Sequence, residues 1–587
     1  MRWNAQARAV TVCFGLVGLF SVYSIRLIDL QIVKHEEYAA LAAEKHVHKQ
    51  TIYARRGIIR DTHGEALTEN LPVKTIVADA SHLRDPMAVA EAIANQLEMD
   101  PRELADKLRT RRPYIVLKKE IPEQQADQLK ETIRIGGLRG VYFEHDFVRV
   151  YPNRSMLSQV VGFLDHDHKG VLGVEKTMQD VLQGTNGYRY IELDRTGREI
   201  VPYRGLETPA KDGCDVTLTI DMGLQNIVEG ELAAACAEYK PKDAAAIMMR
   251  PQTGEIMALA SWPTFDLNKP GESKPEQTKD RPVVDMVEPG STFKIVTTSA
   301  VIEEKLVTPQ TTIFCENGHF QYAGRVLRDA HPLGMLTVHQ VLEKSSNIGV
   351  AKLALQLGDT KLYEYVRRFG FGERTGVALT GEIPGLVNPP HRWSKLDITR
   401  IPMGQSVAVT PIQMVTAMST IANGGKLMKP MIISKIMDPD GRPVATFQPE
   451  VVRQVISRET TKKITAALKD VVSKQGTAQQ AAVPGFRVAG KTGTAQKIDP
   501  KGGYMQGKYV VSFVGFMPAD DPRFTLLVLL DDPVTKAGEA YGGLVAGPIF
   551  SRMAEKVARY LDLTPTEEVA PLAANQKKVV FREASRD

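Results

Sequence analysis

The sequence predicts a multidomain α+β protein held by a single N-terminal transmembrane helix. Three observations carry this prediction: an uncharged apolar run near the N-terminus, a charged and glycine-punctuated stretch up to about Cys214, and a remainder with strands at both ends and helices between them. At 587 residues, 43% of them hydrophobic and 24% charged, the chain is long enough for two or more cores. A net charge of +5 is slight for this size and gives no reason to expect nucleic-acid binding.

The N-terminal run over residues 9–25 carries no charged side chain, and the apolar pattern continues to Val33. It is at the short end for a membrane span but longer than a typical signal-peptide core, and no small-residue cleavage site follows. Arg2 and Arg8 precede it without an acidic residue, so the positive-inside rule places residues 1–8 in the cytoplasm. We therefore expect an anchor over 9–30 in the cytoplasmic membrane, with the rest of the chain outside; a cleaved signal peptide is the alternative.

Residues 31–214 are predicted to form an elongated, non-catalytic α+β module. The stretch is short in long apolar runs, and helical patterns occur near 87–97 and 122–133. Residues 215–562 are predicted to form the second domain, and 563–587 are a polar tail. The domain opens with a strand over 215–221 and a helix over 224–239.

The core of the second domain is predicted to be an antiparallel sheet with helices. A turn at 251–254 joins strands over 244–249 and 255–260 into a hairpin. Three more strands, over 487–495, 509–516 and 524–531, follow one another at short spacings, which favours antiparallel neighbours. Helical stretches at 338–357, 362–369 and 411–422 lie between the two sets of strands.

Cysteines and histidines form no recognisable framework. Cys13 lies in the anchor, while Cys214, Cys236 and Cys315 are scattered, so we expect buried free thiols, with room for one disulfide. The pair His46 and His48 and the run Asp165-His166-Asp167-His168 match no zinc-ligand spacing and are interpreted as solvated loop. No metal and no cofactor are expected.

The stretch Glu288-Pro289-Gly290-Ser291-Thr292-Phe293-Lys294 precedes an apolar helical run and predicts a nucleophile at a helix start. Residues three apart lie on one side of a helix, so the Lys294 amine can reach the Ser291 hydroxyl. Burial under an apolar helix disfavours the charged form of a lysine, which makes it a base able to activate the serine. A capped core helix with a surface lysine is the alternative for this motif alone.

Two further motifs occur once each, in order: Ser345-Ser346-Asn347 and Lys491-Thr492-Gly493-Thr494. Together with Ser-x-x-Lys they are the active-site set of penicillin-binding proteins and class A β-lactamases. The first part of the chain resembles the pedestal of the class B, monofunctional penicillin-binding proteins. The matching phrases are Arg26-Leu27 with Leu30-Gln31-Ile32, Arg56-Gly57-Ile58-Ile59-Arg60-Asp61 with Gly64, Arg149-Val150-Tyr151-Pro152 and Gly173-Val174-Glu175.

Further phrases of this family lie in the second domain: Pro251-Gln252-Thr253-Gly254-Glu255-Ile256, Phe265-Asp266-Leu267-Asn268, Gly404-Gln405-Ser406 with Thr410-Pro411, and Tyr541-Gly542-Gly543. The resemblance implies a penicillin-binding transpeptidase domain like the serine β-lactamases, preceded by a dimerisation-type pedestal. The family often has Asp-Arg-Asn-Gly where this chain has Asp61-Thr62-His63-Gly64. The anchor and pedestal leave no room for a glycosyltransferase domain between them, which argues against a bifunctional class A protein.

The resemblance also implies roles in acyl transfer. Ser291 would attack the penultimate D-alanine of a peptidoglycan stem peptide, Lys294 would take its proton, and Ser345 would relay a proton to the leaving D-alanine. Asn347 would hold the substrate amide. Substrate binding would fall to Lys491, Thr492 and Thr494, which favour the terminal carboxylate, and to Gly493, which lets the substrate lie against the strand. The oxyanion hole would use the backbone N–H groups of Ser291 and Thr494.

We expect a serine D,D-transpeptidase that cross-links peptidoglycan, is inhibited covalently by β-lactams, and acts at the division septum. Its expected partners are the stem peptides, a membrane glycosyltransferase and other division proteins, bound through the anchor and pedestal. Four alternatives stay open: a cell-elongation class B transpeptidase, a β-lactamase, a membrane-anchored β-lactam sensor, and a division scaffold. The pedestal and uncleaved anchor argue against a secreted β-lactamase, and the short cytoplasmic part argues against a sensor.

Overall fold

The computed structural model describes residues 5–38, 47–83, 85–112, 114–138, 140–193, 199–202, 207–499, 502–535 and 540–567. Arg2, His46 and the tail beyond residue 567 lie outside the described residues, as does the side chain of His48.

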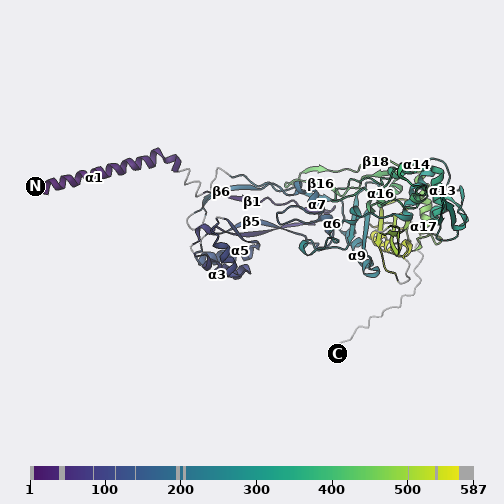
Figure 1. Cartoon of the computed structure of the whole chain (residues 1–587), viewed down its shortest axis with the longest axis horizontal. Helices are drawn as coiled ribbons and strands as arrows, with labels where there is room; N and C mark the ends of the chain where they lie inside the picture. Colours follow the sequence, from purple (N-terminus) through teal and green to yellow (C-terminus); the bar gives the residue numbers. More distant parts are fainter. Residues whose placement is uncertain are drawn as a thin grey trace, which may run out of the picture. The chain divides into compact units, whose positions relative to one another are not determined.

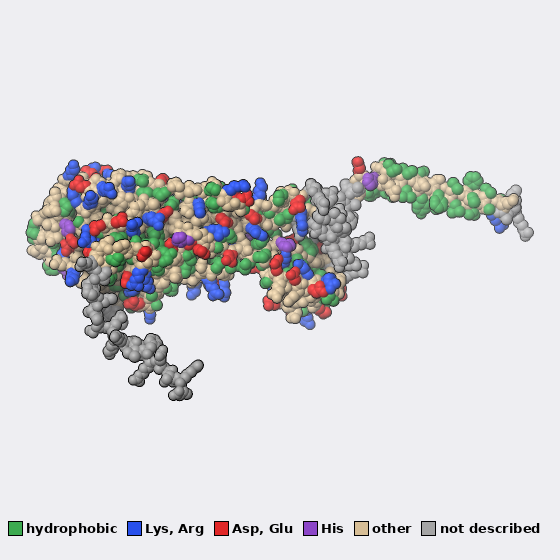
Figure 2. Space-filling view, turned by 180° about the vertical axis from the view of Figure 1, so that it is seen from behind, with side chains coloured by type: hydrophobic (Ala, Val, Ile, Leu, Met, Phe, Trp, Pro, Cys, Tyr) green, Lys and Arg blue, Asp and Glu red, His purple; other side chains and the backbone are tan. Residues whose placement is uncertain are grey.

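The N-terminal helix has the length and composition of a membrane span. Helix α1 (Ala5–Ile28) continues through a short π-helical turn η1 (Asp29–Val33), so that a helix over Gln6–Val33 is long and apolar enough to cross a membrane. Its apolar side chains are exposed along the whole helix, which Figure 2 shows as a hydrophobic surface. Arg26 and Asp29 form an ion pair on its last turns.

The rest of the chain forms two compact units, and neither is a single stretch of sequence. The first contains residues 1–57, 70–150 and 183–213, and the second contains 58–69, 151–182 and 214–587. The predicted domain boundaries at 31–214 and 215–562 stay predictions.

Beyond the N-terminal helix, the described residues of the first unit form two small sheets that are accompanied by the α-helices α3, α4 and α5. Its sheets have the strand orders β1-β6-β7 and β4-β3-β5. A core of its own forms where α3, α4 and α5 pack their apolar faces on the second sheet, through Ile76, Ile93, Leu104 and Leu129. Helices α3 and α5 confirm the two predicted helical stretches. The elements are β1 (Val47–Ile52), β3 (Glu69–Ala78), η2 (Ala80–His82), α3 (Pro86–Leu97), α4 (Pro101–Leu108), β4 (Ile115–Pro122), α5 (Glu123–Ile135), β5 (Val141–Val150), β6 (Gly187–Leu193) and β7 (Glu199–Pro202).

The second unit is organised around a five-stranded sheet with the order β10-β9-β21-β20-β19, in which all neighbours are antiparallel. This confirms the predicted hairpin and the predicted run of three antiparallel strands. Its strands are β9 (Asp243–Met249), β10 (Ile256–Trp262), β19 (Ala489–Ile498), β20 (Tyr504–Met517) and β21 (Phe524–Asp531). Strand β19, which carries the Lys-Thr-Gly motif, lies at the edge of the sheet.

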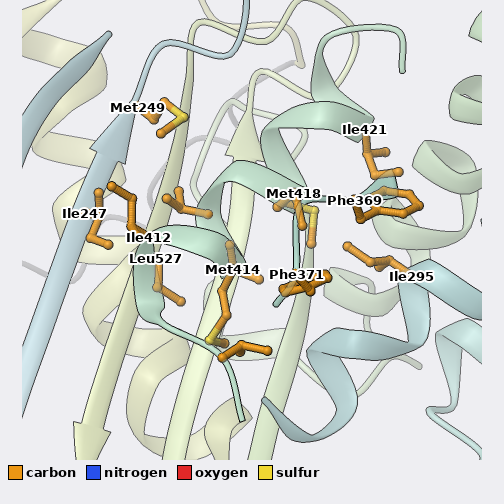
Figure 3. Close-up of a cluster of buried hydrophobic side chains, with 14 of the residues drawn as sticks. Ile247, Met249, Ile295, Phe369, Phe371, Ile412, Met414, Met418, Ile421 and Leu527 are labelled. Carbon is orange, nitrogen blue, oxygen red and sulfur yellow. The ribbon is translucent and has the colours of Figure 1, made fainter. Parts of the chain in front are cut away.

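Both faces of this sheet are covered by helices, because successive side chains of each strand point to opposite faces. Ala244, Ala246 and Met248 pack with α9 (Met222–Tyr239) and α18 (Gly542–Tyr560). Ile247 and Met249 pack on the other face, against α16 (Pro411–Ala422), and α11 (Lys294–Glu303) belongs to the same core cluster. Figure 3 shows that second face, where Ile412 of α16 lies beside Ile247 and Leu527 of the strands, while Met418 and Ile421 lie toward Phe369 and Phe371. The result is a rigid α+β layering (Figure 1) that fixes the ends of α11 and β19.

A second sheet, β17-β16-β8-β2, explains why residues 58–69 belong to this unit, because β2 pairs in parallel with β8. The remaining elements are β2 (Ile59–Arg60), α6 (Ser158–Val161), α7 (Gly173–Thr177), α8 (Gln179–Leu182), β8 (Asp215–Leu218), η3 (Pro270–Glu272), α10 (Arg281–Val284), η4 (Gly290–Phe293), β11 (Thr312–Phe314), η5 (Glu316–Gly318), β12 (His319–Tyr322), β13 (Arg325–Arg328), β14 (Met335–Thr337), α12 (Val338–Glu343), α13 (Asn347–Leu357), α14 (Asp359–Arg368), η6 (Pro390–Arg392), α15 (Asp397–Arg400), η7 (Ile401–Met403), β15 (Lys426–Met428), β16 (Ile433–Met437), β17 (Pro443–Thr446), β18 (Val451–Gln454), α17 (Arg458–Val472) and η8 (Gln479–Ala481).

One predicted helix is two. The stretch over 338–357 breaks between α12 and α13, because Ser345 adopts a left-handed conformation with φ of 58° and Ser346 is extended and caps α13 through its hydroxyl. The cysteine prediction is confirmed in that all four thiols are free, although Cys214 is half-buried and Cys13 is exposed. Residues 165–168 form an exposed turn, as predicted.

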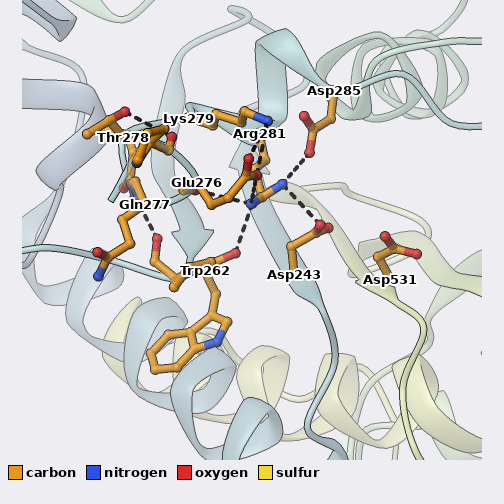
Figure 4. Close-up of polar contacts among 12 residues, drawn as sticks. Asp243, Trp262, Glu276, Gln277, Thr278, Lys279, Arg281, Asp285 and Asp531 are labelled. Atoms are coloured by element: carbon orange, nitrogen blue, oxygen red, sulfur yellow. Dashed lines mark hydrogen bonds and ion pairs between the residues drawn. The ribbon is translucent and has the colours of Figure 1, made fainter. Parts of the chain in front are cut away.

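The segment that leads to Ser291 is held by a buried arginine. Arg281, at the start of α10, pairs with Asp243 of β9 at 3.1 Å and with Asp285 at 2.7 Å, and donates to the Trp262 carbonyl at 2.9 Å (Figure 4). Because a buried charge is tolerated only when it is paired and hydrogen-bonded, this network fixes α10 on the sheet.

Candidate active site

Ser291 lies on the 3₁₀ turn η4, whose last residue leads directly into α11. Thr292 closes the turn by donating its hydroxyl to the Pro289 carbonyl at 2.8 Å, and Phe293 packs on Phe371 with ring centroids 4.8 Å apart. The Ser291 side chain is half-buried, and within the described part of the chain its hydroxyl makes no hydrogen bond. Ser291 is therefore fixed by its backbone while its hydroxyl stays available.

Lys294 is fully buried one turn further on. Its Nζ donates to Asn347 Oδ1 at 2.7 Å, to Ser345 Oγ at 3.1 Å and to the Ser345 backbone carbonyl. The amine thus bonds the second motif rather than the Ser291 hydroxyl that the helical spacing predicted. Burial lowers the pKa of Lys294 to about 7, although the nearby Asp329 carboxylate acts in the opposite direction.

The second motif lies in the break between α12 and α13, where Asp329 holds it. The Asp329 carboxylate accepts from the Ser346 hydroxyl at 2.7 Å and from the backbone N–H groups of Asn347 and Ile348. Asn347 Nδ2 donates to the Arg328 carbonyl at 3.0 Å, which leaves Oδ1 facing Lys294. Sequence reasoning missed Asp329 because it follows an unremarkable hairpin and belongs to no motif.

Lys491 of β19 brings the third motif to the same point. Its fully buried Nζ donates to Ser345 Oγ at 3.0 Å and to Thr492 Oγ1 at 3.4 Å. Desolvation, with the repulsion of Lys294 as a smaller cause, holds the pKa of Lys491 well below its ordinary value. The Ser345 hydroxyl therefore accepts from two lysines that reach it from different elements.

The remaining residues of the third motif line the edge of the sheet. Thr492 is buried beside Thr477, and Thr494 is half-buried. The Thr494 hydroxyl accepts from the Gly542 N–H at 3.0 Å, so its own proton remains to donate. A Cβ at Gly493 would lie 2.3 Å from Ser512 Oγ and 3.0 Å from the Pro289 carbonyl oxygen, so glycine here also allows the strand to approach the turn of Ser291.

Two contacts support the turn of Ser291 from outside the three motifs. Gly404, with φ of 78°, leaves room for the Gly290 backbone: a Cβ there would lie 2.2 Å from the Gly290 oxygen. Glu288 accepts from the Ser406 N–H at 3.0 Å and from the Tyr504 hydroxyl at 3.1 Å. The Gly404-Gln405-Ser406 phrase was visible in the sequence, but only the fold shows that it lies against the turn.

This geometry provides the parts that acyl transfer needs. Ser291, whose hydroxyl has no hydrogen-bond partner among the described residues, lies one helical turn from a lysine of depressed pKa, and the Ser345 hydroxyl connects that lysine to a second buried lysine. Acyl transfer needs groups of these kinds: a hydroxyl, an amine that can be neutral near pH 7, and a hydroxyl that links it to a second amine. The fold and the site define a serine acyltransferase of the penicillin-recognising type.

Comparison with known proteins gives the family. The model of the penicillin-binding protein transpeptidase domain matches residues 244–555, and that of the penicillin-binding protein dimerisation domain matches 51–218. Stage V sporulation protein D of Bacillus subtilis is 37% identical, over 91% of this chain and 83% of its own length. Peptidoglycan D,D-transpeptidase FtsI of Escherichia coli K12 is 30% identical, over 92% of this chain and 89% of its own length. Penicillin-binding protein PbpB of Mycolicibacterium smegmatis is 34% identical, over 92% of this chain and 88% of its own length.

A solved structure of a penicillin-binding protein has the same fold as this chain. Penicillin-binding protein 3 of Mycobacterium tuberculosis, solved with aztreonam, superposes with a TM-score of 0.70 at 28% identity, over 89% of this chain and 99% of that one. The chain therefore belongs to the class B penicillin-binding proteins, the family of peptidoglycan D,D-transpeptidases.

Proposed function

We propose that Ser291 is the nucleophile of this D,D-transpeptidase and forms the acyl-enzyme. The observation that carries the proposal is the position of Lys294, fully buried one turn from Ser291 and bonded to Ser345 Oγ and Asn347 Oδ1. With a pKa near 7, a large share of Lys294 is neutral at physiological pH and can accept a proton.

In the proposed reaction, Ser291 Oγ attacks the carbonyl of the penultimate D-alanine while its proton passes to Lys294. The tetrahedral oxyanion is held by the backbone N–H groups of Ser291 and Thr494. Collapse breaks the C–N bond, and the proton reaches the leaving D-alanine amine through Ser345, which contacts both lysines. The amine of a second stem peptide then attacks the ester carbonyl and transfers its proton to Lys294. Lys294 returns that proton to Ser291 Oγ as the ester C–O bond breaks, which regenerates the enzyme.

Substrate recognition is proposed for the residues around this path. Asn347 has its amide nitrogen on the Arg328 carbonyl and its oxygen on Lys294, so it is rigidly placed beside the site, where it would hold the substrate amide. Lys491 and the hydroxyls of Thr492 and Thr494 would bind the terminal carboxylate, for which a lysine supplies a point charge. Gly493 would let the substrate backbone lie along the edge strand.

The proposal is tested by covalent labelling with a fluorescent penicillin, together with release of D-alanine from a D-Ala-D-Ala donor. Ser291→Ala should lose both signals. Ser299→Ala is the matched control, because Ser299 is a buried serine of α11, the helix that follows the turn of Ser291, and its hydroxyl has no hydrogen-bond partner among the described residues. Labelling that persists in Ser291→Ala, or that disappears in Ser299→Ala, would assign the nucleophile elsewhere.

At the level of the cell, the proposal is a septal enzyme anchored by α1, with its N-terminus in the cytoplasm and a pedestal that binds a membrane glycosyltransferase and other division proteins. Similarity to FtsI and the shared pedestal phrases support it. Similarity to stage V sporulation protein D favours a second role in a sporulation-specific wall. A fluorescent fusion separates them: septal localisation in dividing cells supports the first, uniform lateral localisation supports an elongation enzyme, and signal confined to sporulating cells supports the second role.

A further inference from the structure

Three metal-ligating side chains meet outside the residues used above: His339, Glu343 and Asp470. Their ligand atoms all lie within 4.8 Å of one another. His339 and Glu343 lie four residues apart on α12, and therefore on one face of it, while Asp470 comes from the last turn of α17. No familiar ligand spacing marks these residues in the sequence, because the third group lies on a distant helix.

The chemistry of the three groups suits a divalent transition metal. An imidazole nitrogen with two carboxylate oxygens is a ligand set of Zn²⁺, which binds such atoms at about 2.0–2.2 Å and uses three protein ligands where a fourth position stays open. His339 Nε2 and Asp470 Oδ2 already lie 2.6 Å apart, and Asp470 is half exposed, so its carboxylate has room to move to the roughly 3.3 Å that neighbouring ligands of a tetrahedral ion require.

Burial sets the Glu343 carboxylate apart from an ordinary surface acid. Its side chain is only 10% exposed, and the charge that pairs with it is Lys344 at 2.9 Å. Lys344 also donates to the Gln475 carbonyl at 2.8 Å. The Lys344 amine therefore keeps one hydrogen bond when a metal ion displaces it from the Glu343 carboxylate. Two carboxylates beside one imidazole give this cluster of three side chains the negative charge that a dication needs.

We propose that His339, Glu343 and Asp470 bind one divalent transition-metal ion, which links α12 to α17. Both ends of this link lie close to the active-site motifs. Ser345 follows Glu343 by two residues, and the chain after α17 carries Thr477, which contacts Thr492. The ion takes no part in acyl transfer. It acts as a positioning element that holds the second motif against the helix preceding the third.

The experiment measures the amount of zinc bound to the full-length protein in detergent. After treatment with a chelator, the protein is dialysed against Zn²⁺, and bound metal is measured by elemental analysis for wild type and for His339→Ala, Glu343→Gln and Asp470→Asn. The matched control is His391→Ala, which removes an exposed histidine of η6. Zinc held by thiols or other histidines contributes equally to every sample, so the difference between samples reports this site.

Wild type and His391→Ala should bind one equivalent more than each of the three variants, and Zn²⁺ should raise the melting temperature of the first two by several degrees but not that of the others. Glu343→Gln keeps the shape of the side chain, so it remains informative if another variant folds poorly. Far-UV circular dichroism of the metal-free proteins reports folding independently of metal. Equal zinc content in wild type and Glu343→Gln, or an equal melting shift, overturns the proposal.

Discussion

At the scale of single residues, the site depends on keeping two lysines buried around one hydroxyl. Lys294 and Lys491 are both inaccessible to solvent, and both donate to Ser345 Oγ. Burial disfavours their charged forms, and the charge of Lys294 further lowers the pKa of Lys491. Burial therefore increases the neutral fraction of Lys294 near pH 7, and only a neutral amine can accept a proton.

The first prediction is a pH dependence of acylation. In the proposed mechanism Lys294 is the base in its neutral form, and its pKa is lowered to about 7, so the acylation rate with a fluorescent penicillin should rise about tenfold from pH 6 to pH 8 and then level off. A folded pKa below the ordinary value of 10.5 also means that the unfolded chain binds the proton more tightly. The contribution of Lys294 to stability should therefore grow between about pH 7 and 10.5. A flat rate between pH 6 and 8 would remove Lys294 from the role of base.

A second prediction concerns the lifetime of the penicilloyl-enzyme. Rapid hydrolysis of a penicilloyl-enzyme needs a carboxylate that aims water at the ester, as in class A β-lactamases. Glu373 is paired with Arg367 and Arg453, and Glu364 lies within reach of Lys361, so neither is free for this task. After free penicillin is removed, intact-mass measurements should show the adduct on Ser291 for many minutes. A rapid return to the unmodified mass over repeated cycles would indicate a β-lactamase.

Lys491→Ala is predicted to impair acylation more than folding. Losing a charged hydrogen-bond donor at the site should slow acylation by roughly 10- to 100-fold, while the melting temperature falls by only a few degrees. Lys497→Ala is the matched control, because Lys497 lies on the same strand but pairs with Asp531 instead of Ser345. If Lys491→Ala fails to fold, or slows acylation no more than Lys497→Ala does, the assignment of Lys491 to substrate binding is wrong.

At the scale of elements, the turn of Ser291 is placed by backbone packing as well as by side chains. Gly404 leaves space for the Gly290 backbone, and Gly493 leaves space for the Pro289 carbonyl. Both glycines come from segments far from Ser291 in sequence, so the position of Ser291 depends on the assembled fold as well as on its own turn.

Gly404→Ala should therefore slow acylation and destabilise the fold. The glycine has φ of 78°, and a Cβ would lie 2.2 Å from the Gly290 oxygen, which only a shift of the turn can relieve. Gly441→Ala is the control: its φ is 80°, but a Cβ there meets nothing within 4 Å, so it reports the backbone cost alone, about 1 kcal/mol. Melting curves and labelling rates measure both effects. Equal loss in the two variants would show that crowding at Gly290 is unimportant.

Much of the order of helices and strands could be predicted from the sequence, but few of the side-chain contacts between them could. Strand β21 coincides with the predicted 524–531, and α16 with 411–422, because periodicity and flanking breakers are local signals. The break at Ser345 was missed, since the serine adopts its left-handed conformation where the distant Asp329 holds the loop. Lys294, Ser345, Asn347 and Lys491 of the three motifs do lie in contact, while their roles stay predictions. The support from Asp329 and Tyr504 depends on contacts that no spacing encodes.

At the scale of the whole molecule, the sequence passes between the two compact units more than once. Residues 58–69 and 151–182 are part of the second unit although the dimerisation-domain match covers 51–218. The two units therefore cannot be separated by a single cut in the chain. Variants and truncations are best compared in the full-length protein, since removing the first 214 residues would delete strand β2 and helices α6, α7 and α8 from the second unit.

The last prediction is the topology of the chain. Helix Gln6–Val33 is long enough to span a bilayer, Arg8 lies on its N-terminal side, and the apolar side chains along it are exposed in the described residues. By the positive-inside rule, its N-terminus faces the cytoplasm and both compact units lie outside. Protease added to intact spheroplasts should then digest nearly the whole chain, and a C-terminal tag should disappear, while a cytoplasmic marker protein survives until the membrane is lysed. A protected fragment the size of either unit would reverse the orientation, and loss of the N-terminal residues from the mature protein would show a cleaved signal peptide instead.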